Sequence, residues 1–210
     1  MKYLTSLLFI ASLMISPLSA AMVRTDFAEN AASVTPLLEG MMVPDGRLMT
    51  PDGAPVSLRA ITLQKPTVLL FYRGGWCPYC NQQLSELKRI ERDLVDMGYQ
   101  IVAVSPQSLE ELGEQQLKTD FAAQLYVDPT LEVLKGFGIG FYVDSATQSR
   151  YQDYGIALAM TGNGKAVLPA PALFIVDIKG RVQFSYVNPD YKVRPSAELV
   201  LAVAKVLTQK

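Results

Sequence analysis

The chain has 210 residues, enough for one ordinary domain with added elements. Half of its residues are hydrophobic and 19% are charged, which excludes a disordered chain because burial of apolar surface offsets the entropy lost on ordering. Nineteen basic and twenty acidic residues give a net charge of -1. No segment concentrates the basic residues, so the sequence excludes nucleic acid as an expected partner.

Histidine and cysteine usage narrows the chemistry further. The chain has no histidine, which excludes Ser-His-Asp and Cys-His activation of a nucleophile and every metal site with histidine ligands. Its two cysteines, Cys77 and Cys80, are too few for a zinc site of four thiolates. We therefore expect neither a metal nor a cofactor, and the C-x-x-C pair is where chemistry is expected.

The start of the chain, residues 1–20, is typical of a cleavable secretory signal peptide. Lys2 precedes an apolar run over residues 7–15, and small residues follow, which fits cleavage after Ala20 or Ala21. An uncleaved membrane anchor is the alternative, but the apolar stretch is short of the roughly 20 residues that a spanning helix needs. We expect an exported protein with no stable membrane insertion after cleavage, periplasmic if the source is Gram-negative and secreted otherwise.

The mature chain begins with a weakly patterned segment, residues 21–34, which we expect to be an N-terminal extension. Two short strand candidates follow at 47–50 and 55–58. They flank the turn signature Pro51-Asp52-Gly53, which predicts a β-hairpin near the N-terminus of the domain.

The next predicted elements enclose the two cysteines. Residues 67–72 form a continuous apolar run of the kind found in a central strand buried on both faces. After the C-x-x-C, apolar residues recur at spacings of three and four from Leu84 to Met97. This periodicity predicts an amphipathic helix that ends near Gly98.

Alternating strands and helices continue beyond that helix. Residues 100–105 and 124–127 are strand candidates, and Ser108 with Glu111 has the spacing of a capping box that opens a helix between them. This alternation predicts βαβ crossovers and a parallel portion of sheet.

The C-terminal third contains a predicted insertion and a second hairpin. Asp128 and Pro129 supply an N-cap and a first-turn proline for a third helix that ends near Gly136. Residues 138–166 are rich in Gly, Tyr, Ser and Asn, and we interpret them as an irregular insertion.

Two elements complete the domain after the insertion. Residues 172–177 and 181–187 flank a Lys-Gly turn and predict a hairpin. Ser196 has the position of an N-cap for a final helix.

The position of the two cysteines favours thiol chemistry. The predicted strand leads through two glycines into the helix, which places Cys77 at the helix N-terminus, where unsatisfied N–H groups and the helix dipole favour a thiolate. Arg73 is a candidate thiolate-stabilising side chain. Cys80 follows one turn later, close enough to attack a mixed disulfide on Cys77. We therefore expect Cys77 to be the attacking thiol, more exposed and more ionised, and Cys80 to be the resolving thiol.

A structural disulfide is the alternative role for this pair. Its closed loop has only four residues, for which the chain-entropy relation gives about 2 kcal/mol against about 3 kcal/mol for fifteen. A stabilising disulfide more often joins distant segments, so redox activity is favoured. A non-catalytic binding module with a structural disulfide stays open as an alternative function.

The segment 71–80, F-Y-R-G-G-W-C-P-Y-C, resembles the thioredoxin superfamily, specifically its peroxiredoxin-like (AhpC/TSA, or redoxin) branch. The resemblance covers about residues 35–208. For the domain 35–210 it implies a thioredoxin-like α/β fold with a central mixed β-sheet flanked by helices, an N-terminal hairpin and an insertion before the last hairpin. It also implies thiols or disulfides, of proteins or small molecules, as substrates, with a protein as reducing partner.

The same resemblance implies a cis-proline beside the cysteines, and Pro171 has the matching position. We therefore predict that the Ala170–Pro171 bond is cis and that Ala170 and Pro171 bind substrate through the backbone. Trp76 is expected to shield the cysteines and to contact substrate, with core packing as the alternative.

Two departures from the family patterns bear on the reaction. Phe71 stands where thioredoxins carry a buried acid, and the peroxiredoxin pattern P-x-x-x-T/S-x-x-C, aligned on Cys80, meets Arg73 and Cys77 instead of its proline and threonine. We expect an exported thiol-disulfide oxidoreductase. The alternative is an antioxidant thiol peroxidase in which Cys80 attacks a peroxide and Cys77 condenses with the resulting sulfenic acid.

Two further groups of residues have open roles. Asp190, Tyr191 and Arg194 belong to a segment that resembles a recurrent family segment, for which a turn and helix entry is the default interpretation. Tyr151 and its neighbours Tyr142 and Tyr154 either line a substrate groove or attach the insertion to the core.

Overall fold

The computed structural model describes residues 24–118 and 123–209, without the side chains of residues 116–118. The predicted signal peptide, residues 1–20, lies outside this part. Within the described residues, no helix combines the length and the apolar character that a membrane crossing requires.

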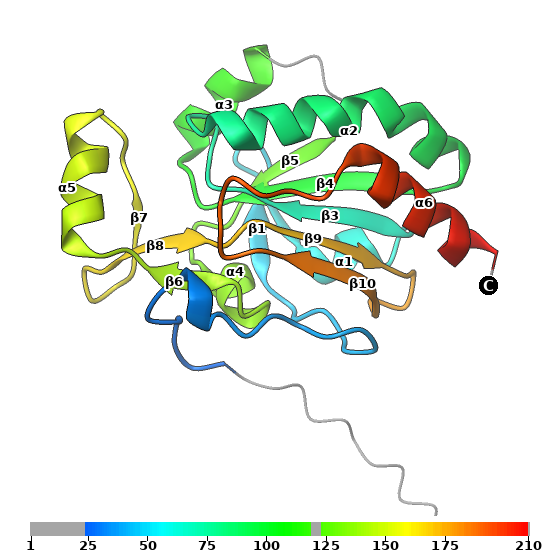
Figure 1. Ribbon diagram of the computed structural model, residues 1–210, viewed down its shortest axis with the longest axis horizontal. Coiled ribbons are helices and arrows are strands. Elements are labelled where there is room, and N and C mark those ends of the chain that lie inside the picture. The colour runs from blue at the N-terminus through cyan, green and yellow to red at the C-terminus, as the bar shows by residue number, and fades with distance from the viewer. Residues whose placement is uncertain (1–23, 119–122, 210) are drawn as a thin grey trace, which may run out of the picture.

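A seven-stranded sheet forms the centre of the molecule, with the order β10-β9-β3-β4-β5-β1-β2 (Figure 1). Its strands are β1 (Arg47–Met49), β2 (Pro55–Ser57), β3 (Thr67–Phe71), β4 (Gln100–Ser105), β5 (Gln124–Val127), β9 (Ala172–Val176) and β10 (Val182–Val187). Strand β3 pairs parallel with β4 and antiparallel with β9, so the sheet is mixed as predicted. Both predicted hairpins, β1–β2 and β9–β10, are confirmed.

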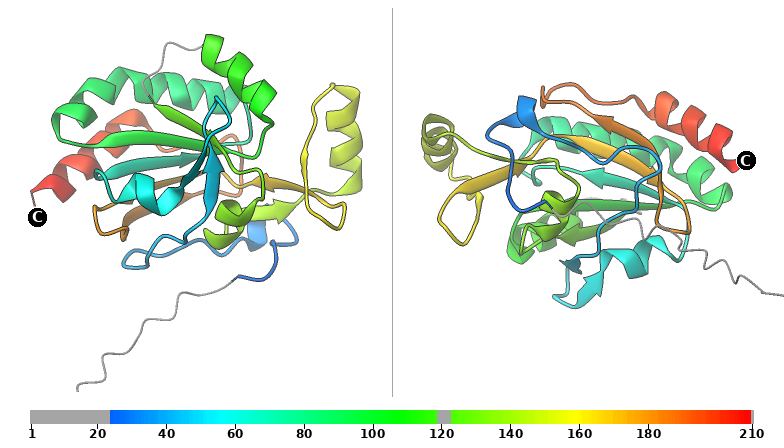
Figure 2. Two further views of the ribbon diagram at one scale, coloured as in Figure 1. Left: turned by 180° about the vertical axis from the view of Figure 1, so that it is seen from behind. Right: turned by 90° about the horizontal axis from the view of Figure 1, so that it is seen from below.

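Helices cover both faces of this sheet, as Figure 2 shows. The helices are α1 (Leu58–Thr62), α2 (Pro78–Asp96), α3 (Leu109–Lys118), α4 (Glu132–Gly136), α5 (Ser145–Asp153) and α6 (Ala197–Thr208). Alternate residues of β3 point to opposite faces: Val68 and Leu70 pack in one apolar cluster with α2 and α6, and Leu69 and Phe71 pack in the other with α1 and α4. Every residue of β3 is buried, which confirms the predicted central strand.

Local capping follows the sequence at two helices and departs from it at a third. Ser108 and Glu111 form the predicted capping box before α3, and the Ser196 side chain accepts from the Leu199 amide at the start of α6. The Asp128 prediction is wrong, because α4 begins at Glu132 after an additional turn. The Asp128 carboxylate instead accepts from the backbone amide of Leu134 at 2.8 Å.

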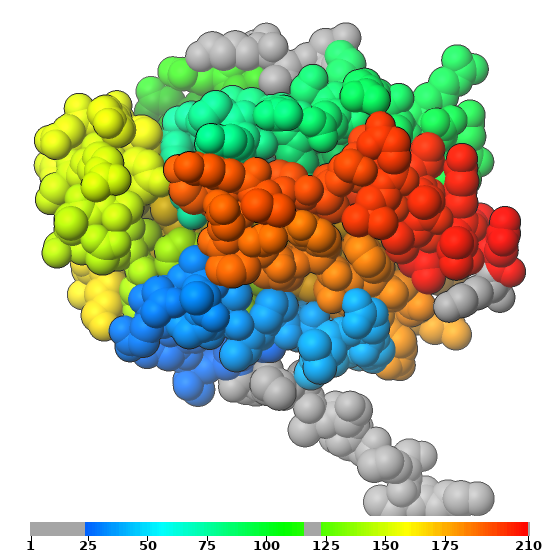
Figure 3. All heavy atoms as spheres, viewed as in Figure 1, coloured from blue at the N-terminus to red at the C-terminus, as the bar shows by residue number. Residues whose placement is uncertain are grey.

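The prediction that the insertion, residues 138–166, is irregular is wrong. It contains α5 and three strands, β6 (Gly140–Tyr142), β7 (Ala159–Met160) and β8 (Ala166–Pro169), which form a second sheet of order β6-β8-β7. Helix α5 has no buried residue, so no apolar periodicity marked it in the sequence. Figure 3 shows this region as a lobe at the end of the molecule opposite the C-terminal end of α6.

The described part of the N-terminal extension packs against that second sheet. A short 3₁₀-helix, η1 (Ala31–Ser33), follows the Asn30 cap. The amide of Ala28 donates to the Gly140 carbonyl at 3.1 Å, and the amide of Thr35 donates to the Gly138 carbonyl at 3.0 Å. These backbone bonds fix the segment to the strand that follows α4.

Candidate active site

The C-x-x-C lies where the central strand passes into the longest helix. Strand β3 ends at Phe71, and α2 begins at Pro78 with Cys77 as its N-cap residue. Gly74, at φ +148°, forms the turn between them, and a Cβ at this position would lie 2.6 Å from the indole nitrogen of Trp76. The tight turn therefore requires glycine and brings the sulfurs to the helix N-terminus.

Both cysteines are buried thiols. Cys77 is 2% exposed and Cys80 is 0% exposed, and their side chains are free of disulfide and hydrogen-bonded to each other. Cys77 is the more exposed of the two, as predicted, but only by this small margin. The segment before α6 reaches this pair, because Arg194 contacts the Cys80 sulfur.

The ionisation order of the pair is the reverse of the prediction. The Cys77 thiol donates to Cys80, and together with the backbone amide of Arg73 and the charge of Arg194 this lowers the pKa of Cys80 to about 6. The same donated hydrogen bond, then burial, raises the pKa of Cys77 far above its usual value. Cys80 is thus the thiolate of the pair and Cys77 the protonated partner.

Two arginines lie at the site, and they act differently from the prediction. Arg194 donates through Nη2 to the Cys80 sulfur at 3.4 Å. Arg73 donates its backbone N–H to that sulfur, while its guanidinium donates to the Tyr151 hydroxyl at 3.1 Å and stacks 4.4 Å from the ring centre of Tyr191. The Arg73 side chain is therefore not the thiolate-stabilising group; Arg194 is.

The role of Arg194 was missed from the sequence, although its segment was singled out. Residues 188–194 lead from β10 toward α6, and Tyr191 packs edge-on against Tyr79 of the C-x-x-C at 5.6 Å between ring centres. The contact between Arg194 and Cys80 joins residues 114 positions apart. No local pattern reports such a contact, so only the resemblance of the segment to a recurrent family segment marked it.

Trp76 is half-buried and packs on Tyr151 of α5, with 5.2 Å between ring centres. Of the three tyrosines in the insertion, only Tyr151 reaches the cysteine site. Tyr142 bonds to Asp26 in the N-terminal extension, and Tyr154 is 71% exposed. Contact of Trp76 with substrate stays a prediction.

The predicted cis bond before Pro171 is wrong, because the Ala170–Pro171 bond is trans. Both residues are buried in the short link between β8 and β9. The Ala170 amide donates to the Ile139 carbonyl, and the Pro171 carbonyl accepts from Asn188. The chain thus passes in an extended path from one strand to the next, and no cis turn exposes a backbone edge for substrate here.

A chain of uncharged hydrogen bonds holds the loop before Cys77. The Gly75 amide donates to Gln107 Oε1 at 2.7 Å, and Gln107 Nε2 donates to Gln115 Oε1 at 2.9 Å. The buried hydroxyl of Tyr72 donates to the same oxygen at 3.0 Å. These glutamines carried no sequence signal, because they meet the loop only through the fold.

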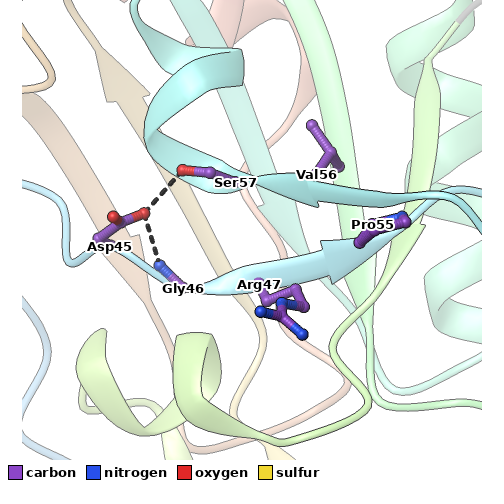
Figure 4. Close-up of a pocket in the computed structure, with 6 residues that line it drawn as sticks. All are labelled: Asp45, Gly46, Arg47, Pro55, Val56 and Ser57. Carbon is purple, nitrogen blue, oxygen red and sulfur yellow. Dashed lines mark hydrogen bonds between the residues drawn. The ribbon is translucent and has the colours of Figure 1, made fainter.

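A hollow of about 560 Å³ lies at the base of the β1–β2 hairpin, far along the sheet from β3 (Figure 4). The carboxylate of Asp45 accepts there from the Gly46 amide at 2.9 Å and from the Ser57 hydroxyl at 2.7 Å. This acid therefore closes its own turn, and the lining residues include no cysteine. Within residues 24–118 and 123–209 no group of three Cys, Asp or Glu is arranged to bind a metal ion.

Comparisons with known proteins identify a family and relatives for this chain. Residues 40–185 match the model of the AhpC/TSA family. A prostamide/prostaglandin F synthase of Danio rerio is 27% identical over 95 residues, which are 44% of this chain and 46% of that protein. The chain thus spans about half the length of this curated relative.

Solved structures show the fold. Peroxidoxin BcpB of Mycobacterium tuberculosis superposes with a TM-score of 0.63 at 18% identity, covering 80% of this chain and 97% of that one. Reduced Prx3 of Vibrio vulnificus in complex with hydrogen peroxide gives 0.67 at 15% identity, covering 83% and 99%. Peroxiredoxin 6 of Arenicola marina gives 0.64 at 16% identity, covering 81% and 73%. The predicted thioredoxin-like fold is confirmed.

Proposed function

The chain belongs to the AhpC/TSA family, a family of thiol-dependent peroxidases and oxidoreductases, and we propose that it is a thiol peroxidase with Cys80 as the attacking thiolate. One observation carries this proposal: Arg194 and the Arg73 amide both donate to the sulfur of Cys80, the more deeply buried of the two cysteines. A peroxide is small enough to reach a buried sulfur. A protein disulfide must bring its own sulfur into contact at the surface.

The reaction needs both cysteines and one external reductant. The Cys80 thiolate attacks the distal peroxide oxygen, the O–O bond breaks, and the leaving alkoxide or hydroxide takes a proton to become alcohol or water. Cys80 is then a sulfenic acid. The Cys77 thiol condenses with it, releasing water and forming the Cys77–Cys80 disulfide. A dithiol of a reducing partner protein then attacks this disulfide, passes through a mixed disulfide and leaves as its own disulfide, which returns Cys77 and Cys80 to two thiols.

The surroundings of the pair support these roles. Arg194 and the Arg73 amide place positive charge and N–H groups at the Cys80 sulfur, where the thiolate attacks. Cys77 donates its proton toward Cys80, so it is already within reach for condensation. Among the structural neighbours, the Vibrio vulnificus protein is described in complex with hydrogen peroxide, which gives this fold a precedent for holding that substrate.

Thiol-disulfide exchange, the function expected from the sequence, is the second candidate. It is favoured by the position of Cys77 at the N-cap of α2, where exchange proteins place their attacking thiol. Burial of Cys77 and the bonded backbone of Ala170 weigh against it.

Single-cysteine variants separate the two functions. We expect Cys77→Ser, pre-reduced and mixed with hydrogen peroxide in a stopped-flow instrument, to consume one equivalent and to form a sulfenic acid on Cys80 that dimedone traps. Cys80→Ser should not consume peroxide. If Cys80→Ser instead forms a stable mixed disulfide with a protein disulfide through Cys77, and neither variant reacts with peroxide, exchange is the function. If the wild type reacts with neither hydrogen peroxide nor a protein disulfide, the remaining function is the non-catalytic binding module with a structural disulfide.

We also propose that the chain is exported, on the basis of the composition of residues 1–20. Expression of the full chain in a Gram-negative host, followed by fractionation and N-terminal sequencing, tests this. The expected result is periplasmic protein that begins at Ala21 or Met22. Cytoplasmic protein that retains residues 1–20 would contradict it.

A further inference from the structure

The Arg73 guanidinium is a buried positive charge with no acidic partner. The residue is 6% exposed, and its Nε is buried without any hydrogen bond. Its one side-chain hydrogen bond goes to a neutral phenol, that of Tyr151. No carboxylate in the described part of the chain forms an ion pair with it.

The charges around the cysteines therefore do not balance. Arg194 is matched by the Cys80 thiolate, which its Nη2 contacts. Arg73 has no such anion, and the Nε of Arg194 is also buried without a partner. Since a buried charge is costly unless it is paired, the site is arranged for one more negative charge than the protein supplies.

The walls around Arg73 indicate the kind of molecule that would bring this charge. Its guanidinium carbon lies 4.4 Å from the ring centre of Tyr191 and 6.0 Å from that of Phe141, and Tyr151 binds its Nη1. Aromatic rings favour an organic body, and a guanidinium fork favours a carboxylate over a point anion. An inorganic peroxide offers neither feature.

We propose that the preferred substrate is an organic hydroperoxide that carries a carboxylate, with the carboxylate bound by Arg73 and the O–O group directed at Cys80. This inference rests on the proposed peroxidase function and names its substrate class. The carboxylate takes no part in the reaction: the hydroperoxide becomes the alcohol, the transferred oxygen stays on Cys80 as the sulfenic acid, and Arg73 keeps its charge throughout. Arg73 is thus a specificity-determining residue.

Cumene hydroperoxide and its para-carboxylate derivative form a matched pair that differs by one charge. For the wild-type enzyme we expect kcat/KM to be about tenfold or more higher for the carboxylate, which is the magnitude of one charged hydrogen-bonded contact. If the enzyme reduces both hydroperoxides with equal kcat/KM, the inference is overturned and the peroxidase function stands.

Substitutions at Arg73 locate the preference. Arg73→Gln should lower kcat/KM about tenfold more for the carboxylate than for cumene hydroperoxide, and Arg73→Lys should keep part of the preference. Arg89→Gln, an exposed arginine paired with Glu198, is the control and should behave as wild type. A role of Arg73 that is only structural predicts equal losses for both substrates, which would refute the inference.

Binding without turnover gives a readout that does not depend on activity. Trp76 is the single tryptophan of the chain, and it packs on the tyrosine that binds Arg73. In the Cys77→Ser/Cys80→Ser variant, para-isopropylbenzoate should change Trp76 fluorescence at much lower concentration than para-isopropylbenzamide. Equal or absent binding of both would overturn the inference. Binding of the carboxylate by an enzyme that reduces no peroxide would refute the proposed function alone.

Discussion

At the scale of single residues, the surroundings of each sulfur decide its role. Position in the helix suggested that Cys77 would ionise first, because it is nearer the N-terminus. Three hydrogen bonds reach Cys80 instead, from the Cys77 thiol, the Arg73 amide and Arg194. The pair was predictable from the sequence, whereas the order within it depends on an arginine 114 positions away.

The charge of Arg194 should be visible in the titration of Cys80. With a pKa of about 6, wild-type reactivity toward iodoacetamide should rise as the pH passes 6 and level off above 7. Arg194→Gln removes an adjacent positive charge and should raise that pKa by about one unit or more, lowering the rate at pH 6 roughly fivefold. Lys192→Gln, an exposed change in the same segment, is the control. Identical profiles for both variants would contradict the role of Arg194.

Asp128 should make the stability of the fold depend on pH. Burial raises its pKa from 3.8 to about 7, so the folded state keeps a proton that the unfolded state releases. The contribution of Asp128 to the free energy of unfolding is therefore complete below about pH 4 and is lost as the pH rises through 7. In the wild type, this group should make the free energy of unfolding fall by about 2 kcal/mol between pH 5 and pH 8. In Asp128→Asn that fall should be absent.

Urea unfolding at several pH values measures this effect. Asp96→Asn, an exposed carboxylate on α2, should retain the wild-type pH dependence. If the free energy of unfolding of Asp128→Asn depends on pH as strongly as that of the wild type, the pKa of Asp128 is not raised in the folded state.

At the scale of elements, the sequence predicted what local patterns encode. A continuous apolar run marked strand β3, and the caps Ser108 and Ser196 marked the starts of two helices. Helix α5 gave no such signal, because none of its residues is buried. The start of α4 was misplaced because Asp128 bonds to the Leu134 amide across a turn that the sequence does not mark.

The joint between the N-terminal extension and the strand after α4 depends on one glycine. Gly138 has φ +67°, and a Cβ there would lie 2.1 Å from the Thr35 carbonyl oxygen. Gly138→Ala should therefore lower the free energy of unfolding by about 2 kcal/mol or more. Gly113 lies inside α3, where an added Cβ would have no atom within 4 Å, and is the matched control. Gly113→Ala should stabilise by about 0.5–1 kcal/mol, and a similar effect at both sites in urea unfolding would contradict the role of Gly138.

At the scale of the whole molecule, three distant parts of the chain close over the cysteines. Tyr151 of α5 and Tyr191 before α6 both contact Arg73, which follows β3. The two reacting cysteines were predictable from the sequence. The tyrosines that pack around them were not, because these contacts form only after the sheets are assembled. Figure 1 shows α5 and the chain before α6 approaching the same end of the central sheet.

Removing part of this cover should expose the thiolate. Tyr191→Ala deletes a ring that packs on both Arg73 and Tyr79, so the bulky reagent DTNB should react several-fold faster with the reduced enzyme. Tyr154→Ala changes a tyrosine that is 71% exposed and is the matched control. Equal DTNB rates for the two variants would show that Tyr191 does not limit access.

The bonds that shape the loop before Cys77 have a consequence for where such an enzyme can work. They pass through amides and through the Tyr72 phenol, whose pKa burial raises above its usual value. None of these groups changes charge between mildly acidic and mildly alkaline solution. Acidity of the surroundings therefore changes the ionisation of Cys80 but not the charge of any group that bonds to this loop, so the loop keeps one geometry while the sulfur responds.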